Sequence, residues 1–246
     1  MACRGLHAPG GAATALCEPT DPLVDWLAAV APGCGLAWDA GCGSGQLSVP
    51  LAARFERVIA TDVSPEQLAR AAPHPRVEYR CSPAEASGLP PGVADLAVAA
   101  QAAHWFDLDG YYAEVRRIAR PGAIFALATY GELQVDDAVD RVVQCFRTEV
   151  LAPHWPPERR HVDDGYQSLP FAFPEIEPPA VEMRAEWTLA RLIGYVQTWS
   201  AVRALQRMEG PDSVDTVRRE LALAWGAAGA RSVRWPLALR VGRVGS

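Results

Sequence analysis

LAWDAGCGSGQLSVPLAARF (36–55) predicts a short buried strand, a tight turn at GCGSGQ (41–46) and a helix, in that order. Glycines allow the sharp turn and let the backbone approach a ligand closely, and the amide groups that open the helix then face that ligand. RVIATD (57–62) predicts a second strand that ends on Asp62, about 20 residues further on, where an acid suits the vicinal hydroxyls of a ribose. Alone, the glycines explain only a turn and Asp62 only a helix cap; together, in this order, they predict a nucleoside site.

The same alternation of strands and helices extends on both sides of this turn. We expect helices that begin at Asp21, Ser64 and Asp107 or Asp109, and strands over 76–81, 94–101 and 123–130. Strands that are apolar throughout are buried on both faces, and their alternation with helices is typical of a parallel sheet. The sequence therefore predicts a doubly wound, mostly parallel α/β fold.

After residue 131 the pattern changes. We expect a helix over 136–151, a Pro-rich stretch without regular structure over 153–179, a strand over 181–188, helices over 189–208 and 212–225, and a last strand over 231–244. We expect the last strand to be antiparallel, and Pro236 within it favours an edge or a bulge. A long irregular segment in a compact domain is usually a lid or a functional insert.

These segments predict one domain with four parts. They are a loosely ordered leader (1–20), a cofactor-binding α/β core (21–131), a helix plus a Pro-rich insert that is a candidate lid (132–179), and strands and helices that complete the same domain (180–246).

The composition excludes several classes of chemistry. The chain has 246 residues and a net charge of −6, which argues against nucleic-acid and polybasic membrane binding. All 23 basic residues are Arg, which excludes a lysine Schiff base and the lysine of a Walker loop and suggests the codon bias of a GC-rich bacterium. The six cysteines form no CxxC pair and no zinc spacing with histidine, so we expect free thiols and no metal.

Targeting signals are also missing from the sequence. No apolar run approaches the roughly 18 residues of a membrane span, and the Gly-, Ala- and Pro-rich beginning lacks the apolar core of a secretory signal. We therefore expect a cytoplasmic protein with no membrane partner.

Two residues around the glycine turn indicate which nucleoside binds. A dinucleotide turn carries Gly or Ala at its sixth position, but counting from Gly41 that position is Gln46. Asp39 precedes the first glycine by two residues; it would repel a pyrophosphate but suits an ammonium group. S-adenosylmethionine carries an ammonium group and a ribose diol and has no phosphate, so the residues favour this cofactor.

Longer stretches resemble the class I S-adenosylmethionine-dependent methyltransferases, and within them the type 11 branch of quinone and trans-aconitate methyltransferases. The matching stretches are WDAGCGSGQLS (38–48), VIATDVSPEQLARA (58–71), VEYRCSPAEASGLPPGVADLAVAAQAAHWFD (77–107) and YYAEVRRIARPGAIFAL (111–127). The resemblance implies a Rossmann-like methyltransferase fold and S-adenosylmethionine as the cofactor. Pro83 departs from the family, since many relatives carry Asp there.

The resemblance also implies a role for each matched position. Asp39, the backbone of Gly41, Cys42 and Gly43, and Gln46 would hold the methionine part; Asp62 would bind the ribose, Val63 would lie beside the adenine, the Ala84 backbone would meet the adenine edge, and Gln101 would line the methionine end.

Candidate catalytic and substrate residues follow the fourth predicted strand and lie in the insert. His104 would be a general base that takes a proton from the acceptor, or it only packs beside the cofactor, since a carboxylate or thiolate acceptor needs no base. Trp105 is a candidate pocket wall or core residue. Arg159 and Arg160 would bind an anionic substrate from a lid, or they belong to a solvated loop.

Together these features predict methyl transfer from S-adenosylmethionine to a small-molecule acceptor, at oxygen, by direct in-line displacement. One alternative is a diverged methyltransferase-fold protein that binds or cyclises without methyl transfer. Another is a nicotinamide-dependent reductase, against which Asp39 and Gln46 argue. A nucleic-acid methyltransferase is disfavoured by the net charge and by the lack of an Asn/Asp-Pro-Pro-Tyr-like motif after the fourth predicted strand.

Overall fold

Residues 21–245 are the part of the chain that the computed structural model describes, and the leader predicted over 1–20 lies outside them. The described chain forms two compact units, each made of separate stretches of sequence. We call one the sheet unit (21–131, 160–183 and 236–245) and the other the helical unit (132–159 and 184–235). No helix within 21–245 combines the length and apolarity that crossing a membrane requires.

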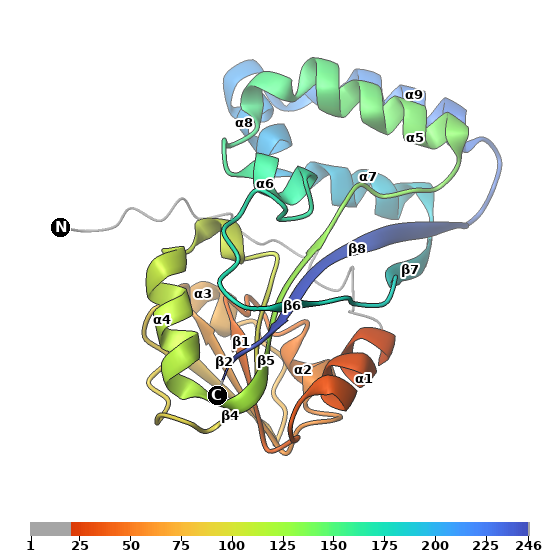
Figure 1. The fold of residues 1–246 in the computed structure, drawn as a ribbon. Helices are drawn as coiled ribbons and strands as arrows, with labels where there is room; N and C mark the ends of the chain where they lie inside the picture. Colours follow the sequence, from red (N-terminus) through yellow and green to blue (C-terminus); the bar gives the residue numbers. More distant parts are fainter. Residues whose placement is uncertain (1–20, 246) are drawn as a thin grey trace. The chain divides into compact units, whose positions relative to one another are not determined.

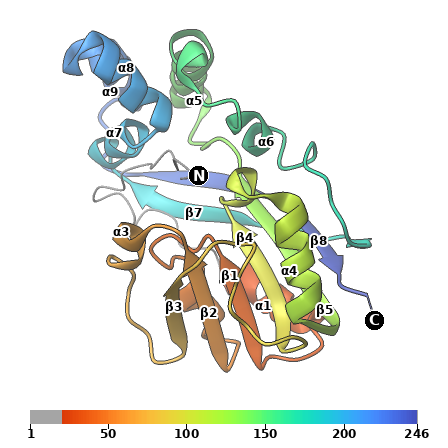
Figure 2. The same cartoon turned by 90° about the vertical axis from the view of Figure 1, so that its left-hand side faces the viewer.

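The strands form one sheet of eight strands among the described residues, in the order β3-β2-β1-β4-β5-β8-β6, with β7 paired to β8 (Figure 2). Their bounds are β1 Leu36–Ala40, β2 Arg57–Asp62, β3 Val77–Cys81, β4 Ala94–Ala100, β5 Ala119–Tyr130, β6 Glu175–Ile176, β7 Glu182–Trp187 and β8 Arg231–Arg243. Strands β1 to β5 pair in parallel, and β8 pairs antiparallel with β5. This confirms the predicted doubly wound fold and its antiparallel last strand.

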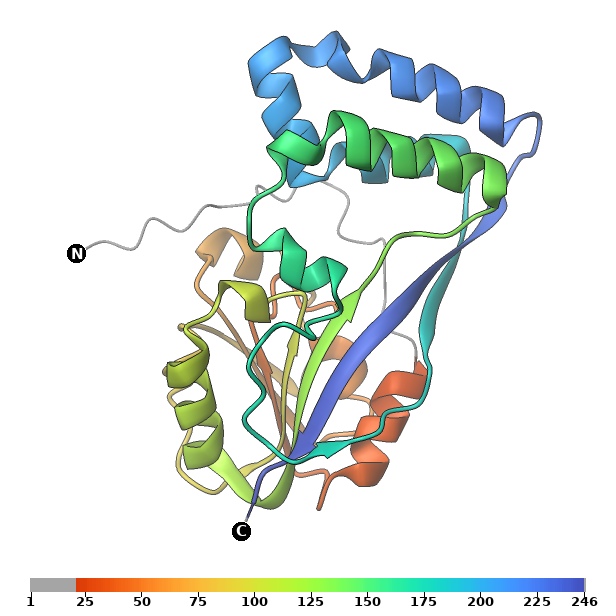
Figure 3. The ribbon, with the colours of Figure 1, turned by 45° about the horizontal axis from the view of Figure 1, so that its top comes forward.

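Alternate residues of the central strands face two different apolar layers, as the strand period of two requires. Trp38 and Phe125 pack with helix α4 (Leu108–Ile118) on one face of the sheet. Ala37 packs with helix α1 (Asp21–Val30) on the other face, and Figures 1 and 3 show these two helices on opposite sides of the sheet. Each large side chain that is fully buried in these layers contributes about 1.5–3 kcal/mol. Both faces are therefore closed by helices, which leaves the strand ends as the place for a ligand.

Two helices of the sheet unit are shorter than the sequence predicts. Helix α2 covers only Ser48–Leu51, where a helix to Phe55 was expected, and α3 covers only Pro65–Leu68, where the helix was expected to end just before Pro73. After α2 the chain continues in turns, in which the Phe55 amide still donates to the Leu51 carbonyl at 2.9 Å, and β2 begins directly afterwards. The apolar spacing continues through these turns, which is why the sequence overestimates the helix.

The Pro-rich stretch 153–179 contains short regular elements, so the prediction of no regular structure is wrong there. Helix α6 covers Arg159–Asp163, and β6 pairs with β8 within the sheet. Pro236 also differs from expectation, because β8 lies between β5 and β6 and is no edge strand. The β5 ladder begins at the next residue, Leu237, so the missing amide of Pro236 removes no hydrogen bond from it.

The helical unit contains the remaining long helices. They are α5 Asp137–Cys145, which continues as a π-helical segment at Phe146–Val150, α7 Leu189–Gln197, α8 Ser200–Glu209 and α9 Asp215–Trp225. Within this unit α5 and α9 lie side by side (Figure 3). The helix predicted over 189–208 is thus two helices, separated at Thr198 and Trp199.

Candidate functional site

A pocket of about 130 Å³ lies in the sheet unit, at the carboxyl ends of β1, β4 and β5. Five of the predicted residues line it: Asp39, Gly41, Cys42, Gln46 and Gln101. They come from two separate stretches of sequence, and the parallel strands bring them to one edge of the sheet, where open α/β folds bind ligands. The rest of the wall is largely apolar and includes Met183 and Leu237, which the sequence did not single out.

The glycine turn is fixed against β2 and against the segment that follows β4. The Cys42 amide donates to the Thr61 carbonyl at 3.0 Å. Gly41 has a φ of +68°, and a Cβ there would lie 2.5 Å from the Ala102 Cβ and 2.9 Å from the Phe106 ring. Any side chain at Gly41 would therefore force this segment away from the turn.

Asp39 has a buried carboxylate whose two oxygens differ in their hydrogen bonding. The Ser48 hydroxyl donates to Oδ2 at 2.6 Å, whereas Oδ1 has no hydrogen-bond partner among the described residues. The pKa of Asp39 is raised to about 7, mainly by burial; the Ser48 hydrogen bond lowers it in part, and the nearby Asp62 charge adds to the rise. A buried charge is costly unless it is paired. A ligand with an ammonium group would supply that pairing, so the residues present fit S-adenosylmethionine.

Asp62 ends β2 and accepts hydrogen bonds from two backbone amides, Gly43 to Oδ2 and Ser64 to Oδ1, each at 2.8 Å. A carboxylate has about four acceptor positions, so each oxygen can still accept a hydroxyl of a ribose diol. Val63 follows and is 64% exposed, which leaves an apolar surface beside the acid.

Gln101 leaves β4 in a left-handed conformation, with a φ of +54°. Its amide donates to the Ala128 carbonyl at 2.8 Å, its side-chain nitrogen donates to the Tyr130 carbonyl at 3.3 Å, and its side-chain oxygen accepts from the Thr129 hydroxyl at 3.1 Å. Non-glycine residues held in this region cluster at functional sites. The end of β5 thus fixes Gln101 at the pocket wall.

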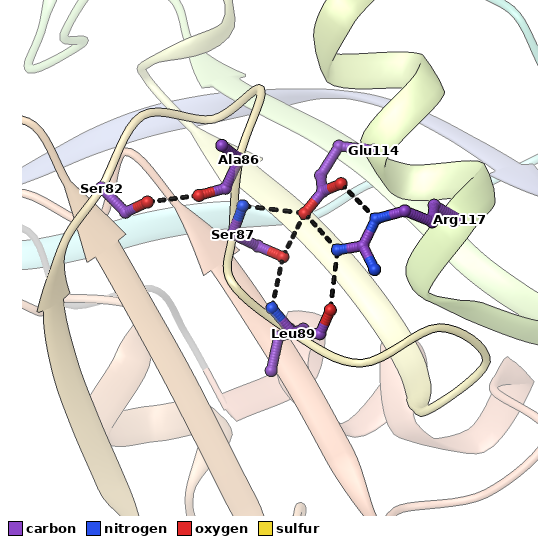
Figure 4. A network of polar contacts seen from close by, with 6 residues as sticks. All are labelled: Ser82, Ala86, Ser87, Leu89, Glu114 and Arg117. Atoms are coloured by element: carbon purple, nitrogen blue, oxygen red, sulfur yellow. Dashed lines mark hydrogen bonds and ion pairs between the residues drawn. The ribbon is translucent and has the colours of Figure 1, made fainter.

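Ala84, which was expected at the adenine, is buried on the loop between β3 and β4. Figure 4 shows how this loop is tied to α4: Glu114 accepts from the Ser87 amide at 2.8 Å and from the Ser87 hydroxyl, and Arg117 donates to Glu114 and to the Leu89 carbonyl at 2.7 Å. Burial by itself would raise the pKa of Glu114, but the hydrogen bonds from Arg117 and Ser87 outweigh it and lower this pKa. No local pattern marks Glu114, because Ser87 lies 27 residues earlier in the chain, before β4.

His104 and Trp105 lie on a single 3-10 turn, η1 (Ala103–Trp105), and neither is among the residues that line the pocket. His104 Nδ1 lies 2.8 Å from the Tyr166 hydroxyl, and the Trp105 side chain is 52% exposed. Tyr166 comes from the Pro-rich stretch, 62 residues along the chain, so no local pattern could have joined it to His104.

Arg159 and Arg160 are adjacent in α6 but belong to different compact units. Within the helical unit the Arg159 guanidinium lies 5.0 Å from the centre of the Trp155 ring. Arg160 is exposed, and its Nε lies 3.4 Å from His161. Over residues 21–245, no group of His, Cys, Asp and Glu side chains is arranged to hold a metal ion.

The known proteins that this chain resembles are described as methyltransferases. A family described as "Methyltransferase domain" matches residues 38–127. A protein of Dictyostelium discoideum whose name calls it a methyltransferase is 32% identical over 193 residues, which cover 77% of this chain and 73% of that protein. A solved structure described as a type II methyltransferase from Anaeromyxobacter dehalogenans has 49% identity and a TM-score of 0.89, over 93% of this chain and 98% of that one. The methyltransferase tpcM of Aspergillus fumigatus is 35% identical over 107 residues, 42% of this chain and 34% of that protein.

Proposed function

Because the chain belongs to the type 11 branch of the class I S-adenosylmethionine-dependent methyltransferases, we propose that it methylates a small-molecule acceptor, at oxygen, by direct in-line displacement. The observation that supports this cofactor most directly is Asp39 Oδ1, which has no hydrogen-bond partner within residues 21–245 and belongs to a residue of the pocket wall. A dinucleotide would bring a negative pyrophosphate to the same carboxylate, which disfavours the nicotinamide-dependent alternative.

Each part of the cofactor has candidate partners in the sheet unit. Asp39 would accept from the ammonium group, and Asp62 would accept from the ribose hydroxyls. The glycine turn with Cys42 and Gln46, together with Gln101, would enclose the methionine part, because all of them line the pocket. Val63 and the loop that carries Ala84 would lie beside the adenine. The sulfonium of the bound cofactor makes its methyl group electrophilic, and the protein supplies binding, orientation and exclusion of water.

His104 and the two arginines are proposed to serve the acceptor. His104 would take the proton of an acceptor hydroxyl as the methyl group arrives, which is general-base catalysis. Trp105, which is half exposed beside it, would contact the acceptor ring or chain. Arg159 and Arg160 would bind an acidic group of the acceptor through forked hydrogen bonds.

Calorimetric titration of the full chain with S-adenosylmethionine and with its demethylated product tests the cofactor assignment. Transfer of a labelled methyl group to a panel of phenols, alcohols, carboxylic acids and thiols then tests the reaction. We expect both ligands to bind and at least one hydroxyl acceptor to be labelled. Absence of binding would contradict the proposal, and binding without transfer to any acceptor would favour the alternative of a binding or cyclising protein.

A further inference from the structure

Two residues near His104 have a left-handed backbone conformation: one precedes it in the sequence, and the other contacts its side chain. Gln101 and Tyr166 are the non-glycine residues within 21–245 that have a positive φ, +54° and +66°. Such conformations cost folding free energy and persist where the surrounding structure enforces them, often at functional sites. Gln101 precedes His104 by three residues, and the Tyr166 hydroxyl lies 2.8 Å from His104 Nδ1.

Both backbone groups of Tyr166 are hydrogen-bonded. Its side chain is fully buried, and its amide donates to the His161 carbonyl at 2.7 Å. Its carbonyl accepts from Arg240 at 3.1 Å, and the same Arg240 nitrogen donates to the Leu169 carbonyl at 2.7 Å. Arg240 is itself buried on β8 and pairs with Glu175 at 2.6 Å. The backbone of Tyr166 is therefore held by contacts other than the one to His104.

The segment that carries His104 lies against the glycine turn of the pocket. Gln101 lines the pocket, and both Ala102 and Phe106 approach Gly41 so closely that a Cβ on this glycine would collide with them. Residues on both sides of His104 are thus anchored where the methionine end of the cofactor is proposed to bind.

We propose that Tyr166 is a positioning residue whose hydroxyl oxygen accepts the Nδ1 proton of His104, so that Nε2 carries the basic lone pair. This inference rests on the proposed function, in which His104 accepts the proton of an acceptor hydroxyl. In that step the oxygen–carbon bond forms while the carbon–sulfur bond breaks. The electron pair of the broken bond stays on sulfur, and the hydroxyl proton moves to Nε2. The Nδ1 proton stays with His104 throughout, still bonded to Tyr166.

The opposite arrangement gives a different chemistry. If the Tyr166 hydroxyl donated to Nδ1, the neutral imidazole would carry its proton on Nε2 and could not accept one there. Tyr166 would then serve only to pack, together with the apolar residues of the layer between the sheet and α4. The tautomer of His104 therefore decides between the two roles, and it can be measured without any ligand.

Nitrogen-15 NMR of the full chain gives this tautomer, with the His104 signals assigned by their loss in His104→Asn. We expect protonated Nδ1 and unprotonated Nε2 in the native protein, and a shift toward the Nε2-protonated form in Tyr166→Phe. Tyr112→Phe is the matched control, because the Tyr112 hydroxyl donates to the Pro170 carbonyl of the same segment and does not contact His104. A native protein with protonated Nε2, or a tautomer that Tyr166→Phe leaves unchanged, would overturn the inference.

Kinetics with phenol and thiophenol as acceptors separates positioning from structural damage. At mildly alkaline pH thiophenol is a thiolate and needs no base, whereas phenol must lose a proton. Tyr166→Phe should lower kcat for phenol about tenfold to a hundredfold, with little change in KM or in the rate with thiophenol. Equal losses with both acceptors would show a structural role only. Failure of the native chain to bind S-adenosylmethionine would instead overturn the proposed function, whatever the tautomer.

Discussion

Asp39 and Asp62 lie near the carboxyl ends of the neighbouring strands β1 and β2, but their carboxylates have different surroundings. Asp39 is 1% exposed and keeps one oxygen without a partner among the described residues, whereas both oxygens of Asp62 are held by backbone amides. The charge of Asp39 therefore depends on pH and on the ligand. Asp62 instead offers a carboxylate whose orientation is set before any ligand arrives.

Affinity for S-adenosylmethionine should rise as the pH rises through about 7, because the ammonium group pairs with ionised Asp39, whose pKa burial raises to about 7. Below that pH, binding should release a proton. Calorimetry over a pH series, in buffers of different ionisation enthalpy, measures both effects. Asp39→Asn should bind weakly and without this pH dependence; a native protein with the same affinity throughout would contradict the assignment.

The same group makes the stability of the ligand-free protein pH-dependent. Between the ordinary pKa of 3.8 and the folded value of about 7, the folded protein keeps a proton that the unfolded chain has lost. The contribution of Asp39 is therefore greatest at low pH and is lost as the pH rises through that window. Thermal unfolding of the native protein and of Asp39→Asn isolates this contribution, since only the native protein carries it.

Asp62→Ala should weaken S-adenosylmethionine binding about tenfold to a hundredfold, because a hydrogen bond to a charged group contributes roughly 1.5–3 kcal/mol. Asp25→Ala is a suitable control, since this exposed acid on α1 pairs only with Arg54 in the contacts that the structure shows. Calorimetry gives the affinity, and circular dichroism shows that each variant is folded. An unchanged affinity in folded Asp62→Ala would contradict the proposal that Asp62 binds the ribose.

Among the elements, the loop between β3 and β4 is held by side chains of helix α4. Glu114 holds the Ser87 amide, and Arg117 holds the Leu89 carbonyl, so a single turn of α4 fixes the loop that carries Ala84 (Figure 4). A preformed loop lowers the entropy lost when a ligand binds. Helix α4 would thereby influence cofactor affinity without touching the cofactor.

Glu114→Ala should lower the free energy of unfolding by about 1–3 kcal/mol, because it leaves the buried Ser87 amide without its acceptor. It should also weaken S-adenosylmethionine binding. Asp215→Ala removes a comparable but exposed Arg pair from α9, and it should change the unfolding free energy by at most about 1 kcal/mol. Chemical denaturation and calorimetry test both variants; equal effects of the two would contradict a special role for Glu114.

Glu114 also gives the stability a pH dependence of opposite sign to that of Asp39. Because its pKa is lowered in the folded protein, its contribution is present above the ordinary carboxyl range and is lost as the pH falls.

The Pro-rich stretch contributes the adjacent Arg159 and Arg160. Replacing both by Ala should raise KM for an acidic acceptor about tenfold to a hundredfold, and much less for its methyl ester, because only the acid loses charge-assisted hydrogen bonds. Arg218→Ala/Arg219→Ala, an adjacent pair on α9, is the matched control. Equal changes for acid and ester would reduce the pair to a structural role.

The sequence predicted the central strands well because buried parallel strands are continuous apolar runs, as in β4. The family resemblance implied that Asp39 and Gln101 both lie at the methionine end of the cofactor, and in the structure both line one pocket. Predictions from the sequence failed where contacts between distant residues determine the local structure. Helix α2 is followed by turns through which the apolar spacing continues, and Tyr166 reaches His104 through a left-handed residue whose carbonyl accepts from Arg240 of β8.

On the scale of the whole molecule, the sheet unit is built from stretches far apart in the sequence. Strand β5 needs β8 as its partner from Ile124 to Tyr130. The stretch 160–183 supplies Phe173, whose ring centre lies 4.9 Å from that of Phe125. The part with the strongest family likeness, up to residue 131, is therefore incomplete as a folding unit.

A fragment of residues 21–131 should fail to fold cooperatively, because β5 loses its antiparallel neighbour and its apolar cover. Thermal unfolding and amide NMR dispersion compare the fragment with the full chain, and addition of a separate 132–246 fragment tests for rescue. A fragment that unfolds cooperatively and binds S-adenosylmethionine like the full chain would show that β8 is dispensable.

The late position of β8 also has a consequence for synthesis of the chain on the ribosome. Its partner β5 is complete at Tyr130, and β8 follows roughly a hundred residues later, a delay of about 5–20 s at ordinary rates of translation. During this delay β5 exposes a row of unpaired backbone groups to which a strand of another nascent chain can add. Neighbouring ribosomes on one message therefore bring together chains that compete with β8 for the same edge. Slower initiation, which spaces those ribosomes apart, should increase the yield of soluble protein.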